Sequence, residues 1–300
     1  MGFLCTTTQL LESIKDRAHA PESQSTYTAP RLLSIASDEL LTYIVPLILS
    51  TQEDYYVTYK DYTATATTSF TLPDRAIGGK LKDVVLVNSA GDEAGAVKRI
   101  DQSQRDQVSG LYCFLRGNNL ILSETTIQPT LRIYYHTRPS RLIELTDCGK
   151  VTSLGASSVD LDLVPSDYTT SVTYDVVSGT APHPVRQLDV TATVVDGTTV
   201  TFATLPTVSI NDYLCTSGES PVVQCPYELV GLLAQKVACK IMEAQGDTQG
   251  LQASATELAR MEKAAFKLLE PRIDSQTTKV LNRGSDLRGL PRKWSYINRV

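Results

Sequence analysis

The chain has 300 residues, of which 42% are hydrophobic and 20% charged, and its net charge is −5. This composition is typical of a soluble globular protein with one or two domains. The longest apolar run, at 43–49, is shorter than the roughly 20 residues that cross a bilayer, and no basic region precedes an apolar segment at the N-terminus. A membrane span and a secretory leader are therefore not expected.

Helical periodicity dominates the first 53 residues. Leu10 and Ile14 begin a short apolar stripe after three threonines that can cap a helix. A second helix is predicted to start at Ala29-Pro30, because proline is favoured in the first turn. Its apolar stripe extends to Ile48, with Pro46 inside the pattern, where proline removes a helical hydrogen bond. We expect a kink or a fresh helix start there.

The period changes from about 3.6 to 2 after residue 53, which predicts strands. Turn signals, including Gly78-Gly79, separate the strands. This spacing favours an antiparallel sheet or small barrel over 54–146. The predicted strands are 55–60, 68–72, 81–88, 96–100, 111–116, 120–122 and 131–137.

An internal repeat follows at 147–222. The stretch 159–166 is similar to 200–207, and each copy has a turn before it and an aromatic-containing strand after it. Both copies therefore predict a strand, a turn, a strand, a proline-marked loop and a strand. Such self-similarity indicates one small β unit used twice, with the two units packed face to face.

Two consecutive helical patterns fill 223–271. The first starts at Pro226 and is ended by Gly246, and the second runs from Thr248 to the residue before Pro271. The short connection predicts an antiparallel hairpin. Its apolar surface exceeds what two helices can cover, so we expect the N-terminal helices to complete one bundle. The predicted bundle core is Leu33, Leu40, Ile44, Leu229, Leu233, Val237, Ile241, Leu258 and Leu268.

The final segment, 272–300, is basic. It holds seven Lys or Arg and two Asp, a net charge of +5, so residues 1–271 carry −10. Its glycines and proline are compatible with a disordered end. The only tryptophan of the chain lies here beside a tyrosine, and Arg, Trp and Tyr are enriched at binding hot spots, which favours an arm that orders on a partner. The candidate docking residues are Arg288, Arg292, Lys293, Trp294, Tyr296 and Arg299.

Motifs for catalysis or for metal or cofactor binding are not found. Six cysteines lack a C-x-x-C pair, and three histidines have no metal-ligand spacing, so we predict reduced, separately buried thiols and neither a metal nor a cofactor. Asp160 and Asp162 share one face of a strand. They are either a solvated pair on the surface or an acidic pair that acts on glycans. Tyrosines such as Tyr55 and Tyr134 pair across strands or stack on bases or sugars.

The predicted fold class is α+β, with the terminal helices in one bundle around a large antiparallel β insertion that contains the duplicated unit, plus an extended C-terminal arm. The stretches 28–33, 44–48, 73–81 and 218–221, followed by the hairpin, resemble the head-to-tail adaptor proteins, also called neck or connector proteins, of tailed bacteriophages. The duplicated β unit is larger than the simplest adaptors carry.

This resemblance implies a structural virion protein without enzymatic activity, located in the virion neck and in the host cytoplasm during assembly. It implies a homo-oligomeric ring, a dodecamer, whose arm inserts between portal subunits and whose lumen passes double-stranded DNA to the tail or to further neck proteins. Two alternatives remain, a tail or baseplate component and a glycan-binding or glycan-hydrolysing β protein.

Overall fold

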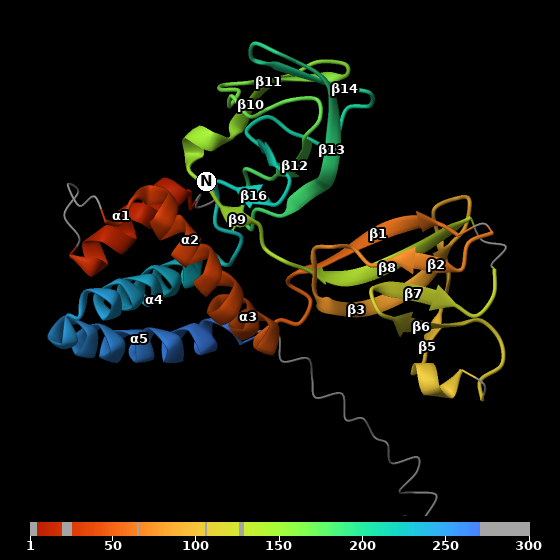
Figure 1. The fold of residues 1–300 in the computed structure, drawn as a ribbon, viewed down its shortest axis with the longest axis horizontal. Helices are drawn as coiled ribbons and strands as arrows, with labels where there is room; N and C mark the ends of the chain where they lie inside the picture. Colours follow the sequence, from red (N-terminus) through yellow and green to blue (C-terminus); the bar gives the residue numbers. More distant parts are fainter. Residues whose placement is uncertain (1–4, 20–25, 65, 106, 126–128, 271–300) are drawn as a thin grey trace, which may run out of the picture.

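The computed structural model describes residues 5–19, 26–64, 66–105, 107–125 and 129–270. These residues form a mixed α+β protein, as predicted, with a helical unit, a unit of two sheets and a closed barrel. Figure 1 shows the three units side by side, with the barrel above the other two. The predicted arm lies outside the described residues.

The helical unit combines helices from both ends of the chain around one core. The long pair α4 and α5 is antiparallel, and α1 and α2 cover α4 (Figure 1). Gly246 ends α4 in the left-handed conformation at φ 74°, and the side chain of Asp247 caps α5. The helices are α1 (Thr7–Ala18), α2 (Ala29–Glu39), α3 (Val45–Thr51), α4 (Tyr227–Gln245) and α5 (Thr248–Leu269).

Pro46 explains the break between α2 and α3. A π-helical turn, η1 (Leu40–Ile44), precedes the proline, and the amide of Val45 donates to the carbonyl of Leu40. The wider turn accommodates a residue that has no amide to donate and would clash in a regular helix. The expected fresh start is thus a π turn inside a continuous helical segment.

At 23 residues and a mean hydropathy of 1.7, Ala29–Thr51 meets the length and composition criteria for a membrane span, which core helices also meet.

The first β region forms two four-stranded sheets, whereas a single sheet or small barrel was predicted. Their inner faces share one apolar core. Gly78 and Gly79, predicted as a turn, instead form an irregularity inside β3 at φ 56° and 65°, where a bulge lets one long strand bend. The first sheet has the order β1 (Val57–Thr63), β8 (Thr130–Thr137), β3 (Ala76–Val87), β4 (Glu93–Ala96), and the second β2 (Ser69–Thr71), β7 (Asn119–Leu122), β6 (Tyr112–Arg116), β5 (Lys98–Arg99).

The repeated segments form a closed six-stranded barrel. Each copy supplies a hairpin and a third strand, and the copies meet edge to edge, with Val159 of β11 opposite Val200 of β14. Edge pairing satisfies the strand edges that two sheets packed face to face would leave open, which corrects the predicted arrangement. The strands are β10 (Gly149–Leu154), β11 (Ser158–Leu161), β12 (Thr173–Val177), β13 (Val185–Asp196), β14 (Thr199–Phe202) and β15 (Tyr213–Thr216).

Short parallel strands connect the three units. β9 (Arg141–Leu142) precedes the barrel and pairs with β16 (Glu219–Ser220), which follows it. The amide of Leu142 donates to Ser37 Oγ of α2 at 2.9 Å, and the amide of Ser140 donates to Gln224 Oε1 at 2.7 Å. The chain therefore enters and leaves the barrel at one place, against the helical unit.

Candidate functional site

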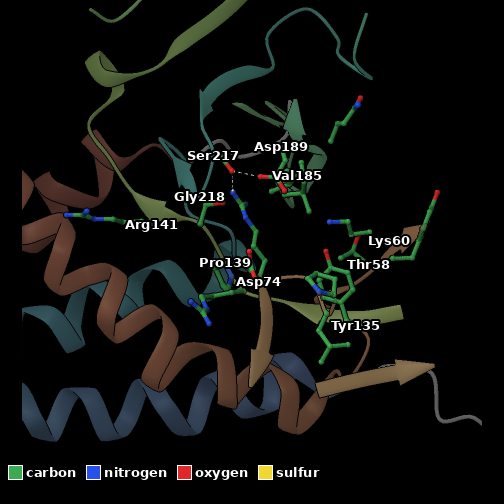
Figure 2. Close-up of a pocket in the computed structure, with 18 of the residues that line it drawn as sticks. Thr58, Lys60, Asp74, Tyr135, Pro139, Arg141, Val185, Asp189, Ser217 and Gly218 are labelled. Carbon is green, nitrogen blue, oxygen red and sulfur yellow. Dashed lines mark hydrogen bonds between the residues drawn. The ribbon is translucent and has the colours of Figure 1, made fainter. Parts of the chain in front are cut away.

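A cleft of about 1150 Å³ lies where the three units meet. Its walls come from α2, from β1, from the loop 72–75 and from the start of β13. Figure 2 shows Tyr135, Thr58 and Lys60 on one side of the cleft and Val185, Asp189, Ser217 and Gly218 on the barrel side. The volume exceeds the roughly 300–1,000 Å³ of typical ligand pockets, and segments distant in sequence converge here.

Arg75 joins two units at the floor of this cleft. Its Nη2 lies 2.5 Å from Asp175 Oδ2 and donates to Ser217 Oγ at 2.9 Å. The hydroxyl of Ser217 donates in turn to Asp189 Oδ1 at 2.6 Å, a contact drawn in Figure 2. Arg75 comes from the two-sheet unit and the other three side chains from the barrel and the turn that follows it. The network therefore fixes how these two units sit against each other.

Asp175 is fully buried, and its carboxylate also accepts the backbone amides of Gly218 at 3.0 Å and Asp189 at 3.1 Å. Burial raises the pKa of Asp175, while Arg75 and the two amides act in the opposite direction. A buried charge held by an arginine and two amides favours one geometry over others, because any displacement leaves it without partners.

Among the described strands, β1 pairs only with β8, and its other edge borders the cleft. The amide of Thr137 donates to the carbonyl of Tyr56, and that of Ala64 to the carbonyl of Pro129, so the even-numbered residues of β1 bond to β8. The backbone groups of Tyr59 and Asp61 therefore point away from β8, and both residues line the cleft. An unpaired edge of this kind can accept another extended strand.

Charged side chains of both signs surround the cleft. The basic ones are Lys60, Arg75, Arg138, Arg141 and Arg186, and the acidic ones are Asp38, Asp61, Asp74 and Asp189. A polyanion such as DNA is held mainly by basic groups, so this mixture favours a polypeptide ligand.

A second cavity, of about 420 Å³, lies at the C-terminal end of α5. Tyr55 lines it, and among the described residues its buried hydroxyl has no hydrogen-bond partner. Tyr227 and Leu268, also in the lining, are 52% and 57% exposed. Apolar surface is thus exposed where the predicted arm begins.

Most predicted core residues lie together in the helical core. Leu33, Leu40, Ile44, Leu229, Leu233, Val237 and Ile241 are buried there, and Leu258 packs against it partly buried. Leu268 does not belong to it, because Leu269 holds the core position at 3% exposure. The predicted face of α5 is therefore corrected by one residue at this end.

The other sequence-based candidates have structural roles in the barrel. Asp160 accepts hydrogen bonds from Ser153 and Thr199, which lower its pKa, and Asp162 accepts the amide of Lys150. A glycosidase acid needs a raised pKa. Within the described ranges, no three His, Cys, Asp or Glu side chains are grouped to hold a metal ion.

Sequence reasoning missed the network of Arg75 and Asp175. The available signal was an aspartate in the middle of an apolar strand, Tyr174-Asp175-Val176-Val177, since a buried acid requires a partner.

Comparison of the chain with protein-family models and with curated proteins finds no match.

Proposed function

We propose that this chain is a structural protein of a phage neck, a head-to-tail adaptor that forms a ring between the portal and the tail. One observation carries the proposal: the first and last helices share one core, while both β units lie between them in the sequence. The resemblance implies a bundle of terminal helices with a large β insertion, and this shared core supports the proposal.

Charge supports the same function. Residues 1–271 carry a net charge of −10 and the final 29 residues +5. An acidic body lining the passage repels DNA phosphates, so the genome slides through without being held. In the sequence, the basic segment follows α5, and Leu268 near the end of α5 lines the second cavity together with the exposed Tyr227. The proposal gives this apolar surface and the basic segment a joint role in docking.

A ring also needs heterologous contacts between copies. The cleft supports this requirement, because it combines a free strand edge with charges of both signs. We therefore assign the cleft to contact with a neighbouring polypeptide and the C-terminal segment to the portal.

Electron microscopy of the purified protein, alone and mixed with portal rings from a tailed phage that encodes it, tests the proposal. We expect coaxial rings on the portal. A variant without residues 275–300 should keep its fold and lose portal binding. Portal binding that survives this deletion would favour a tail or baseplate component, and the absence of any ring with or without portal would contradict the adaptor.

A further inference from the structure

Two of the six free cysteines face each other across a seam of the barrel. β10 pairs with β15 through Gly149 opposite Leu214 and Lys150 opposite Tyr213. Continuing this antiparallel register by one residue places Cys148 opposite Cys215. Cys148 lies between the 3-10 turn η3 (Leu145–Asp147) and β10, and its backbone is extended, with φ −143° and ψ 157°. Its Sγ donates to the carbonyl of Leu145 at 3.4 Å.

The hydrogen bonding identifies the type of pair. The amide of Val151 donates to the carbonyl of Asp212, whereas the amide of Gly149 donates to the hydroxyl of Tyr168, which donates in turn to the carbonyl of Leu214. In this register Cys148 and Cys215 form a pair of the non-hydrogen-bonded type. At the other edge of β15, Cys215 lies opposite Asp175 of β12, and its backbone groups bond to that strand. In a non-hydrogen-bonded pair the Cα atoms are about 4.5 Å apart, within the range of about 4.4 to 6.8 Å found for disulfides.

The two thiols also lie on the same side of the barrel wall. Both belong to a small apolar cluster with Val177, Tyr213 and Val222, and they are 2% and 0% exposed. Leu214, between Tyr213 and Cys215, points instead into the barrel core. The side chains of Cys148 and Cys215 therefore meet outside the barrel, where the chain enters and leaves it.

We propose that Cys148 and Cys215 are a disulfide site, reduced in a reducing compartment and closed by a small-molecule disulfide such as oxidised glutathione. One thiolate attacks the glutathione disulfide and releases a glutathione thiolate. The second thiolate then attacks the protein sulfur of the mixed disulfide and releases the second glutathione. The two protein thiols lose two electrons and two protons, and one glutathione disulfide becomes two thiols.

The bond would fasten the two ends of the barrel. Residues 149–214, which hold nearly all of the barrel, become a closed loop. Closing so long a loop removes much conformational freedom from the unfolded chain, so the barrel should unfold at a higher temperature when oxidised. This inference does not depend on the proposed function.

Burial raises the pKa of Cys215, which slows thiolate formation in the folded protein. The test therefore uses refolding. The full chain is unfolded in urea under reducing conditions, then refolded by dilution into a buffer of oxidised and reduced glutathione. Remaining thiols are alkylated in denaturant and counted by mass, and the linked peptides are mapped.

We expect four of the six thiols to remain and the link to join Cys148 to Cys215. The oxidised protein should melt several degrees above the reduced one. Cys148→Ala should keep all five of its thiols under the same conditions. The matched control Cys113→Ala removes a buried thiol from the core of the two-sheet unit and should still lose two.

Six free thiols at equilibrium in the refolded wild-type protein would overturn the proposal. A link between Cys5 and Cys225 would also overturn it. Thr6 pairs with Val222, which places Cys5 opposite Val223 and leaves Cys225 two residues away from the facing position. Register alone therefore distinguishes the two cysteine pairs.

Discussion

At the scale of single residues, the ion pair of Arg75 and Asp175 joins two units through a fully buried carboxylate. Replacing Arg75 by Met leaves that carboxylate without its cation, so we expect the free energy of unfolding to fall by about 3–5 kcal/mol. Arg260→Met is the matched control, because Arg260 lies at the same 2.5 Å from Glu257 on an exposed helix face. Its cost should stay below about 0.5 kcal/mol in urea unfolding.

The pH dependence of the same variant adds a second readout. The pKa of Asp175 is raised in the folded protein, so the folded state takes up this proton at higher pH than the unfolded state and gains stability as pH falls through the folded pKa. Arg75 lowers that pKa, and its removal raises it further. The loss of unfolding free energy in Arg75→Met relative to wild type should therefore become smaller as the pH falls from about 7 to about 5. A loss of stability that does not depend on pH would instead mean that Arg75→Met acts through lost packing.

His136 should make stability depend on pH in the opposite direction. Both ring nitrogens are buried and have no hydrogen-bond partner in the described chain, and burial, followed by Lys80, lowers the pKa. The unfolded chain binds a proton near pH 6.5 while the folded state resists it, so stability is lost as pH falls below about 6.5. His136→Phe should lose less stability between about pH 7 and pH 5 than wild type. Part of the loss of stability at low pH should persist in this variant, because burial also lowers the pKa of His183. An unchanged pH profile would exclude His136 as the group responsible.

At the scale of elements, two adjacent leucines at the end of α5 differ sharply in burial. Leu269 is 3% exposed and its neighbour Leu268 is 57% exposed. Leu269→Ala removes buried methyl groups at a helix end and should cost about 2–3 kcal/mol, whereas Leu268→Ala should stay within about 0.5 kcal/mol. Thermal unfolding of both variants measures this difference. Equal costs would mean that α5 has a different face turned to the core.

Local patterns predicted the elements better than their arrangement. The helical hairpin followed from its period and from Gly246, and the repeat from its own self-similarity. The two sheets and the barrel did not follow, because strand pairing depends on which edges the whole chain brings together, as with Val159 and Val200. The cleft could not be predicted for the same reason, since its lining combines α2, β1 and β13.

At the scale of the whole molecule, the proposed docking to the portal predicts that charge and apolar anchoring act on different kinetic steps. The proposed arm carries basic residues that steer it toward an acidic surface, and Trp294 and Tyr296 that can fill pockets. Arg288→Gln combined with Arg299→Gln should therefore slow association with the portal and weaken its salt dependence, since exposed charges act mainly on encounter. Dissociation should change little.

Trp294→Ala should have the reverse effect. Loss of a buried aromatic anchor costs about 2 kcal/mol or more at a hot spot, which raises the dissociation rate roughly 30-fold and leaves association nearly unchanged. Surface plasmon resonance on immobilised portal rings measures both rates for the same set of variants. If Trp294→Ala dissociates at the wild-type rate while the arginine variants bind more slowly, the segment steers the chain but does not anchor it. The apolar surface around Leu268 would then be the anchor, and Leu268→Ala, which should leave stability intact, would raise the dissociation rate instead.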